Sequence, residues 1–427
     1  MEELNFQVEE ATIKSIQQAF ADGKLIARKL VDFYLHQIER LNPVLRSVIE
    51  DTIGTRDKLN NTAGSYALLG SKVQRDASVV DRLRKSGALI LGKASLSEWY
   101  RFRSLSGVPN GWCARSGKGV VYSCYLVAIV FHSFVNVIES VSVIWDSMWI
   151  KQWICNIMVC VSLGSETHSS IICPSVNNSV MGIKPTVGLT SQAGVIPMTP
   201  RWDTIGTVLD AVNVLDVIAD GLKGKRLGII RHPFMEKIHG TAESEAFELH
   251  IDTLRQRGAQ IIDNLKIDQI ETILDPNQSG EISIMTAEFK AHINVYLKEL
   301  DDSPMRSLAD IIAFNENNPE LVQSEKTNGL GEHEMAILEN LAKLSTNGFE
   351  KMMKEHKLDA MVTPGSRASA VYAIGGYPVI TVPAGYERDG MPFGICFGGL
   401  RGSEAKLIEI SYAFEQVTKV RKPLSLG

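Results

Sequence analysis

The sequence predicts an α/β fold, because short apolar runs typical of strands alternate along the chain with amphipathic stretches typical of helices. The strand-like runs occupy residues 88–92, 226–230, 259–262, 360–364 and 378–383. The helical stretches repeat apolar residues at steps of three and four and occupy residues 9–42, 76–85, 243–257, 279–299 and 332–356. A chain of 427 residues can bury a large core, either as one domain or as two smaller ones.

Local signals predict where several of these elements end. Pro43 is expected to end the first helical stretch, and Gly87 and Gly258 are expected to close the stretches that precede them. The run 88–92 carries no charged residue, a pattern typical of a strand that is buried on both faces. Residues 93–99 are expected to open a further helix.

The composition is that of an ordinary globular protein, with 22% charged residues and a formal net charge of −5. No run of Lys and Arg is long enough to indicate a nucleic-acid footprint, so we expect no nucleic-acid partner. The first six residues are acidic and lack an apolar core. They indicate no signal peptide and therefore a cytoplasmic location.

The cysteine spacing indicates neither a disulfide framework nor a metal site. No two cysteines form a C-x-x-C pair, and none lies beside histidines at zinc-binding spacing. We therefore expect reduced and mostly buried thiols and no metal ion. The six residues are Cys113, Cys124, Cys155, Cys160, Cys173 and Cys396.

One apolar segment differs from the rest of the chain. From Gly119 to Ile138 no side chain carries a full charge. About 20 such residues are enough to span a bilayer as a helix. Membrane contact through residues 119–138 is therefore an alternative to a purely cytoplasmic protein.

The first candidate for chemistry is the run of small residues 164–175, which is expected to form a loop. Successive backbone N–H groups in such a loop can converge on one point, as an oxyanion hole requires. A serine at the end of the loop can attack a carbonyl carbon if a base takes its proton. The competing interpretation is a polar turn that caps a helix.

His168 lies inside this loop and is a second candidate. Its closeness in sequence to the serines suggests half of a Ser–His–Asp triad, but neighbouring loop residues rarely point at each other. No Asp or Glu is placed in the sequence to orient the ring. We therefore favour a histidine that faces solvent or packs within the loop.

Two glycine-rich stretches near the C-terminus, 375–378 and 398–402, match no phosphate-binding fingerprint. No lysine follows at Walker spacing, and neither stretch joins a strand to a helix in a GxGxxG unit. They are expected to form tight turns at strand ends. No cofactor is indicated.

The ordered blocks of the sequence resemble the amidase-signature family, which includes fatty-acid amide hydrolase and the amidase-like component of glutamyl-tRNA amidotransferase. The resemblance implies a single domain over residues 1–427, with a mixed β-sheet flanked by α-helices. Only the segment at about 120–155 does not match that fold. The blocks that carry the resemblance are residues 58–65, 92–99, 164–190, 194–197, 203–206, 375–378, 381–385 and 392–394.

The resemblance implies hydrolysis of a small carboxylic amide by a Ser–Ser–Lys triad, without metal or organic cofactor. Ser170 falls at the position of the nucleophile. The oxyanion and substrate-binding N–H groups fall on Thr167, His168 and Ser169. In the family a second serine relays the proton to a buried neutral lysine, whose pKa is lowered by loss of hydration.

This chain departs from the family at both proton-handling positions. Glu50 stands where the lysine is expected, in the block 48–55. The Gly-Ser-Ser-Ser-Gly motif that holds the relay serine is absent, and the apolar run at 120–155 stands in its place. His168 and Ser169 replace the family's two glycines before the nucleophile, where side chains can crowd the oxyanion site.

Three interpretations of residues 120–155 stay open: a transmembrane helix, a replacement for a lost core helix, or sequence foreign to the fold such as translated intron. The last is favoured because both edges of the segment are abrupt. The sequence thus predicts an amidase-family hydrolase whose activity is impaired or lost. The alternative is a non-catalytic remnant or a binding protein on the same fold, with an oligomeric state that the sequence does not indicate.

Overall fold

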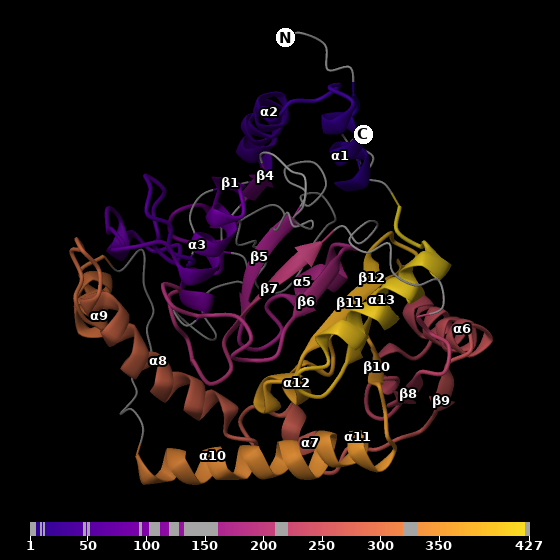
Figure 1. Ribbon diagram of the computed structural model, residues 1–427. Coiled ribbons are helices and arrows are strands. Elements are labelled where there is room, and N and C mark those ends of the chain that lie inside the picture. Colours follow the sequence, from indigo (N-terminus) through magenta and orange to yellow (C-terminus); the bar gives the residue numbers. More distant parts are fainter. Residues whose placement is uncertain are drawn as a thin grey trace.

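An eight-stranded mixed sheet forms the centre of the computed structural model (Figure 1). Three neighbouring strands, β10, β8 and β9, are parallel, and the other pairs in the sheet are antiparallel. The α/β prediction with a mixed sheet is thereby confirmed. In sheet order the strands are β5 (Val161–Glu166), β7 (Thr204–Leu209), β6 (Met181–Lys184), β11 (Val379–Tyr386), β12 (Pro392–Gly398), β10 (Ala360–Pro364), β8 (Arg226–Ile229) and β9 (Gln260–Ile262).

The structure describes most of the chain outside residues 132–160. The described residues are 6–8, 11, 13–45, 48, 52–93, 96–101, 112–118, 128–131, 161–209, 221–318 and 331–422. The helices in this part are α1 (Ile13–Ala21), α2 (Ala27–Leu45), α3 (Ser78–Lys85), α5 (Ile172–Asn177), α6 (Ala242–Gln256), α7 (Ile270–Leu274), α8 (Glu281–Lys298), α9 (Leu308–Glu316), α10 (Glu332–Ser345), α11 (Lys351–Glu355), α12 (Ser369–Gly375) and α13 (Glu404–Thr418).

The central strands are apolar on both faces because helices cover both faces. In β10, Ala360 and Val362 pack into a core shared with α6 and α13, whereas Met361 packs into a core shared with α5, α10 and α12. Side chains alternate across a strand, so a run in which every residue is apolar fits this position. The same alternation holds in β11, where Val379 faces one core and Ile380 the other.

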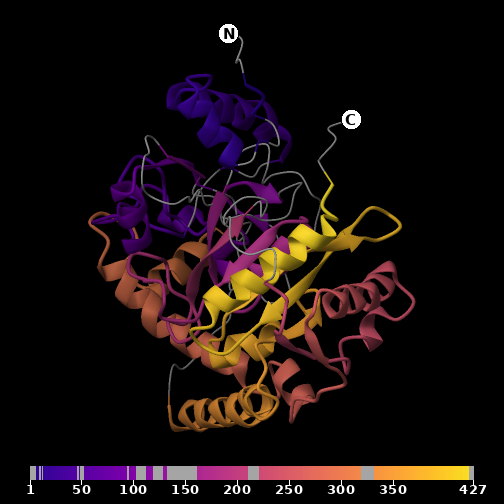
Figure 2. The same ribbon diagram turned by 45° about the vertical axis from the view of Figure 1, so that its right-hand side comes forward.

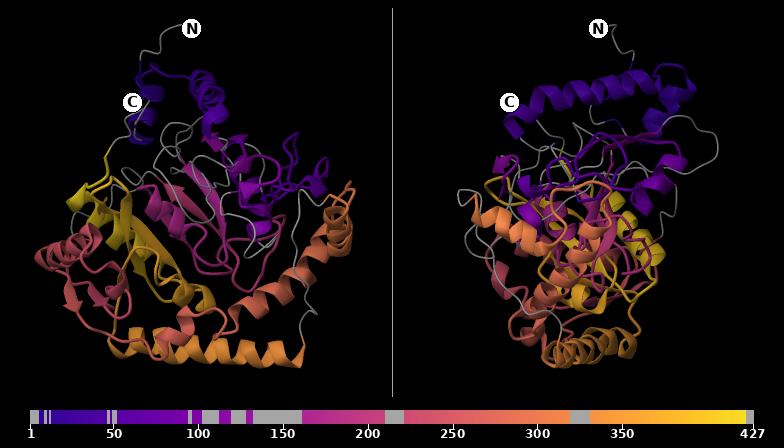
Figure 3. Two further views of the ribbon diagram at one scale, coloured as in Figure 1. Left: turned by 180° about the vertical axis from the view of Figure 1, so that it is seen from behind. Right: turned by 90° about the vertical axis from the view of Figure 1, so that its left-hand side faces the viewer.

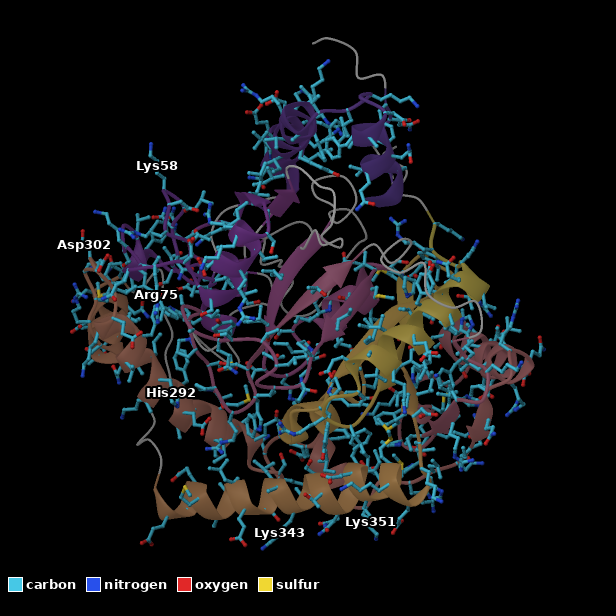
Figure 4. All side chains as sticks on the ribbon, in the orientation of Figure 1. Lys58, Arg75, His292, Asp302, Lys343 and Lys351 are labelled. Atoms are coloured by element: carbon cyan, nitrogen blue, oxygen red, sulfur yellow. The ribbon has the colours of Figure 1, made fainter. Side chains whose placement is uncertain are left out.

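The two ends of the molecule are helical. Helices α1 and α2 lie together at one end in every view, and the run formed by α10 and α11 lies at the opposite end (Figures 2 and 3). Lys343 and Lys351 project from this run (Figure 4) and pair with Glu339 and Asp268, respectively. These are ion pairs at the protein surface, where such pairs contribute little to stability.

Several element predictions are wrong in detail. The stretch 9–42 is two helices separated by a turn at Gly23, and α2 continues past Pro43 to Leu45. The run 88–92 is a strand, β1 (Ala88–Gly92), but it lies in a separate two-stranded sheet, and 39% of Leu89 is exposed. Helices α2 and α3 contact this strand, but Leu89 lies on a side that they leave partly exposed.

Two further segments also differ from the prediction. Instead of an α-helix, residues 93–99 lead into a short 3-10 helix, Glu98–Arg101. The region 164–175 is only partly a loop, because Gly164, Ser165 and Glu166 are the last residues of β5. Hydrogen bonds to β7 hold these small residues in a strand despite their low strand propensity.

The apolar segment 119–138 is described only at residues 128–131. These residues form β4 (Ala128–Phe131), which pairs antiparallel with β1, so that Ala88 lies opposite Phe131. The remainder of residues 119–138 and of 120–155 lies outside the described residues. Of the helices that the structure describes, none combines the length and the apolar character that crossing a bilayer requires.

Candidate active site

The candidate nucleophile lies in the turn that joins β5 to α5. The strand ends at Glu166 and the helix begins at Ile172, and Ser170 stands between them, partly buried. Ser169 has φ of +72°, in the left-handed region where side chains are unfavourable and glycine is preferred. This one residue reverses the chain sharply enough for the helix to follow the strand directly.

The carboxylate of Glu166 accepts hydrogen bonds from the backbone of this turn. Its Oε2 accepts hydrogen bonds from the backbone N–H groups of Ile171, at 2.5 Å, and Ile172, at 2.9 Å. The side chain is buried, with 2% of the residue exposed. Ser170 therefore lies in a short loop whose two ends, Glu166 and Ile171, are joined by a hydrogen bond.

A buried lysine lies near Glu166. Lys184, the last residue of β6, is fully buried, and its Nζ donates to the carbonyl oxygen of Tyr377 at 2.8 Å. Burial lowers the pKa of Lys184 to about 8, although the charge of Glu166 acts in the opposite direction. Burial likewise raises the pKa of Glu166, and the charge of Lys184 opposes that shift. The two groups therefore stabilise each other's charge inside the core.

Two serines meet at the turn. The hydroxyl oxygens of Ser169 and Ser369 lie 2.8 Å apart, and the Ser369 hydroxyl is also 2.6 Å from the carbonyl oxygen of Ser366. Ser369 is the first residue of α12. The turn that carries Ser170 is thus tied to a segment that lies 200 residues further along the chain.

The prediction that no carboxylate orients His168 is wrong. Nδ1 of His168 lies 2.6 Å from Oε1 of Glu281, the first residue of α8. Glu281 is fully buried, whereas 31% of the His168 side chain is exposed. Burial acts to lower the pKa of His168, but the charge and hydrogen bond of Glu281 outweigh it, so the pKa is raised. The error arose because the partner is distant in sequence.

Thr167 contacts a second buried carboxyl group. Its hydroxyl donates to Oδ1 of Asp203 at 2.5 Å, and Oδ2 of Asp203 accepts from the N–H groups of Met198 and Thr199 at 2.9 and 3.0 Å. Burial raises the pKa of Asp203 to about 7 despite these hydrogen bonds. A nearby carboxylate, Glu288, contributes to the rise.

A cavity of about 240 Å³ adjoins this part of the turn. Ser165, Thr167 and Asp203 form part of its wall, and Val195 and Ile205 are among its apolar residues. Of the four predicted site residues, Thr167 lines the cavity, His168 pairs with Glu281 and Ser169 contacts Ser369. Ser170 follows them in the same turn. Within the described ranges, no group of His, Cys, Asp and Glu could hold a metal ion.

The sequence of this chain is similar to that of a known amidase along nearly its whole length. Residues 154–221 match the family profile described as Amidase. The probable amidase of Arabidopsis thaliana is 44% identical over an alignment of 498 positions, which covers 98% of this chain and 92% of that relative. The chain belongs to the amidase family. Because the alignment is longer than the 427 residues of this chain, it contains gaps on the side of this chain.

Solved structures of amidases share the fold. The native peptide amidase of Stenotrophomonas maltophilia superposes with a TM-score of 0.80 at 26% identity, over 97% of this chain and 98% of that enzyme. An amidase family protein from Bacillus anthracis gives the same TM-score at 23% identity. The amidase resemblance inferred from the sequence blocks is thereby confirmed, together with the amidase fold.

Sequence reasoning missed the carboxylates of this amidase-family site. Glu166 is the one acidic residue of the run 164–175, and that isolation is the signal that could have found it. Asp203 stands in the block 203–206 that carries the resemblance, but the resemblance gives it no role. Glu281 has no local signal, because its helix is far from the turn in sequence. Cys113, Cys173 and Cys396 are free and buried, in agreement with the prediction of reduced, buried thiols. The other three cysteines lie outside the described residues.

Proposed function

We propose that this amidase-family protein hydrolyses a small carboxylic amide through Ser170. The observation that carries the proposal is the pair of hydrogen bonds from Ile171 and Ile172 to Glu166, which holds the turn around Ser170 in a defined conformation. A nucleophile has to be held in position before the substrate arrives, because its orientation supplies much of the rate acceleration.

In the proposed reaction the Ser170 oxygen attacks the amide carbon and its proton passes to a base. The backbone N–H groups of Thr167, His168 and Ser169 would stabilise the negative charge that develops on the carbonyl oxygen. The carbon–nitrogen bond then breaks, and the amine leaves with a proton. Water attacks the resulting acyl-enzyme ester, which releases the acid and restores the serine.

We further propose that this reaction is slow in the present chain. Glu50 stands where amidases carry their catalytic lysine, and the block with the relay serine is absent. The gaps in the alignment with the Arabidopsis relative support the view that segments are missing. A nucleophile and its base act as a unit, so losing the base removes most of the acceleration.

The test is turnover of a panel of aryl, fatty-acyl and peptide amides by purified protein, compared with Ser170→Ala. Ser369→Ala is the matched control, because it removes a hydroxyl of α12 that contacts Ser169 in the same turn. We expect a weak rate that Ser170→Ala abolishes and Ser369→Ala reduces less. A rate typical of hydrolases would contradict the proposed impairment. No rate that depends on Ser170 would contradict the hydrolase proposal and favour a non-catalytic binding protein.

A further inference from the structure

We infer that the cavity beside Thr167 is a binding site for a small primary alkylammonium ion, held by Asp203 and Ser165. The inference goes beyond the proposed function and does not require Ser170 to be a nucleophile. It rests on the chemistry of the cavity wall, which combines hydrogen-bond acceptors with apolar side chains and, among the described residues, leaves one buried hydroxyl without a partner.

The unpartnered group is the hydroxyl of Ser165. This residue is 6% exposed and lines the cavity, and its Oγ has no hydrogen-bond partner in the part of the chain that the structure describes. A buried hydroxyl without a partner destabilises the folded protein, because it has lost its hydrogen bonds to water. A ligand that supplies an N–H group in the cavity would remove that cost.

The charged group is the carboxylate of Asp203, which is 7% exposed. Each carboxylate oxygen can accept two hydrogen bonds. Oδ1 accepts from Thr167, which leaves it capacity for a further donor from the cavity. Asp203 also experiences the negative charge of Glu288, which lies on α8 and pairs with Arg201. A cation in the cavity would offset the repulsion between the two carboxylates.

Gln192 provides another acceptor. Its Nε2 donates to the carbonyl oxygens of Pro200, at 3.1 Å, and Asp203, so the atom of the amide that is left for a ligand is the carbonyl oxygen. The residues around this cavity, all within the described part of the chain, include no Lys, Arg or His. Its polar wall therefore favours a donor with a positive charge over an anion.

The apolar part of the wall distinguishes an alkylammonium from a bare metal ion. Val195, Ile196, Pro197 and Ile205 line the same cavity and can contact a short alkyl chain. With a volume of about 240 Å³, the cavity has room for more than one water molecule and for a short organic cation. Methylammonium and ethylammonium are therefore of a suitable size and polarity.

The experiment is a titration of the purified full-length chain with ethylammonium chloride, followed by calorimetry and by the thermal midpoint. Potassium chloride at equal ionic strength and neutral acetamide are the comparison ligands. We expect ethylammonium to bind more tightly than either, and to raise the thermal midpoint in proportion to its binding. Equal effects of potassium, or tighter binding of acetamide, would overturn the inference.

The pH dependence provides a second test on the unmodified protein. With a pKa of about 7, Asp203 is mostly ionised at pH 8 and mostly protonated at pH 6, so the affinity should fall about tenfold between these values. The ligand keeps its charge over this range, as lysine does. Binding that is equally tight at pH 6 and pH 8 would contradict a role for Asp203.

Variants then test the individual groups. Ser165→Ala should weaken ethylammonium binding about tenfold, the value of one hydrogen bond to a charged group. Ser162→Ala is the matched control, because Ser162 is another buried serine on β5 with an unpartnered hydroxyl among the described residues but does not line the cavity. Asp203→Asn should abolish binding. If Asp203→Asn does not fold, the ethylammonium affinities of Ser165→Ala and Ser162→Ala still test the site. Equal losses of affinity in these two variants would refute it.

Discussion

His168 and Glu281 join the candidate nucleophile turn to the start of α8, through atoms that lie 2.6 Å apart. The carboxylate is fully buried and the imidazole is about one-third exposed, so the pair is only partly screened by solvent. A protonated His168 thus provides a positive partner for a buried negative charge. This link makes the stability of the turn dependent on pH.

We predict that the contribution of this pair to stability is largest at acidic pH. The pKa of His168 is raised in the folded protein, so the stabilisation is fully present below the unfolded value of about 6.5. It is lost as the pH rises through the folded pKa. Urea unfolding of the wild type and of Glu281→Gln should therefore differ most near pH 5.5 and least near pH 9.

His232 and Glu236 provide the matched control for this prediction. Their side chains are also 2.6 Å apart, but both are more than half exposed. Solvent screens such a pair, so Glu236→Gln should change the unfolding free energy little at any pH. An equal pH dependence in the two variants would show that burial of Glu281 is not the cause.

A second prediction concerns Glu166, whose carboxylate accepts hydrogen bonds from the turn. Glu166→Ala leaves two buried N–H groups without an acceptor and leaves Lys184 without its nearby opposite charge. Leaving a buried donor without its acceptor typically costs about 1–3 kcal/mol, and Glu166→Ala affects two such donors. Urea unfolding should show a loss of that size, whereas Glu339→Ala, which breaks an exposed pair with Lys343, should cost less than about 1 kcal/mol. A loss under about 1 kcal/mol for Glu166→Ala would contradict the role of this carboxylate in holding the turn.

A third prediction concerns the left-handed residue of the turn. Ser169→Gly removes a side chain from a backbone conformation with φ of +72°, whereas Ser169→Ala keeps the Cβ atom and removes only the hydroxyl. The glycine variant should be more stable than the alanine variant by about 0.5–1 kcal/mol, after its own loss of chain entropy. Both variants lose the contact with Ser369, so their difference isolates the backbone. Equal unfolding free energies would show that the turn bears no strain.

The sequence allowed the central strands to be predicted better than the strand before the nucleophile. Strands such as β10 consist of apolar residues because helices bury both faces, and that pattern is visible in the chain itself. Ser162, Gly164 and Ser165 in β5 have low strand propensity, and pairing with β7 decides their conformation. Pairing between distant segments leaves no local periodicity to detect.

The same distinction applies to the site. Thr167 to Ser170 could be proposed as site residues because they are consecutive and resemble an amidase block. Their partners could not, because Glu281 and Ser369 come from the start of α8 and α12 and meet the turn only in the folded chain. A glutamate at the start of a helix is usually solvated and interacts favourably with the helix dipole. Its presence there therefore does not indicate a buried contact.

The last prediction tests how far Ser170 is activated. A fluorophosphonate reacts with a serine oxygen in proportion to its nucleophilicity, which a neighbouring base raises. We propose that Glu50 stands at the position of the family's lysine and that the relay serine is missing, so we expect slow labelling, mapped by mass spectrometry to Ser170. Ser170→Ala should abolish the label, and Ser369→Ala, which alters the adjacent hydroxyl pair, should retain it.

Rapid labelling at Ser170 would show that another group supplies the base. In that event His168→Gln becomes the decisive variant, because His168 is oriented by Glu281 as the histidine of a triad is oriented by its carboxylate. Loss of rapid labelling in His168→Gln would then assign the base to His168.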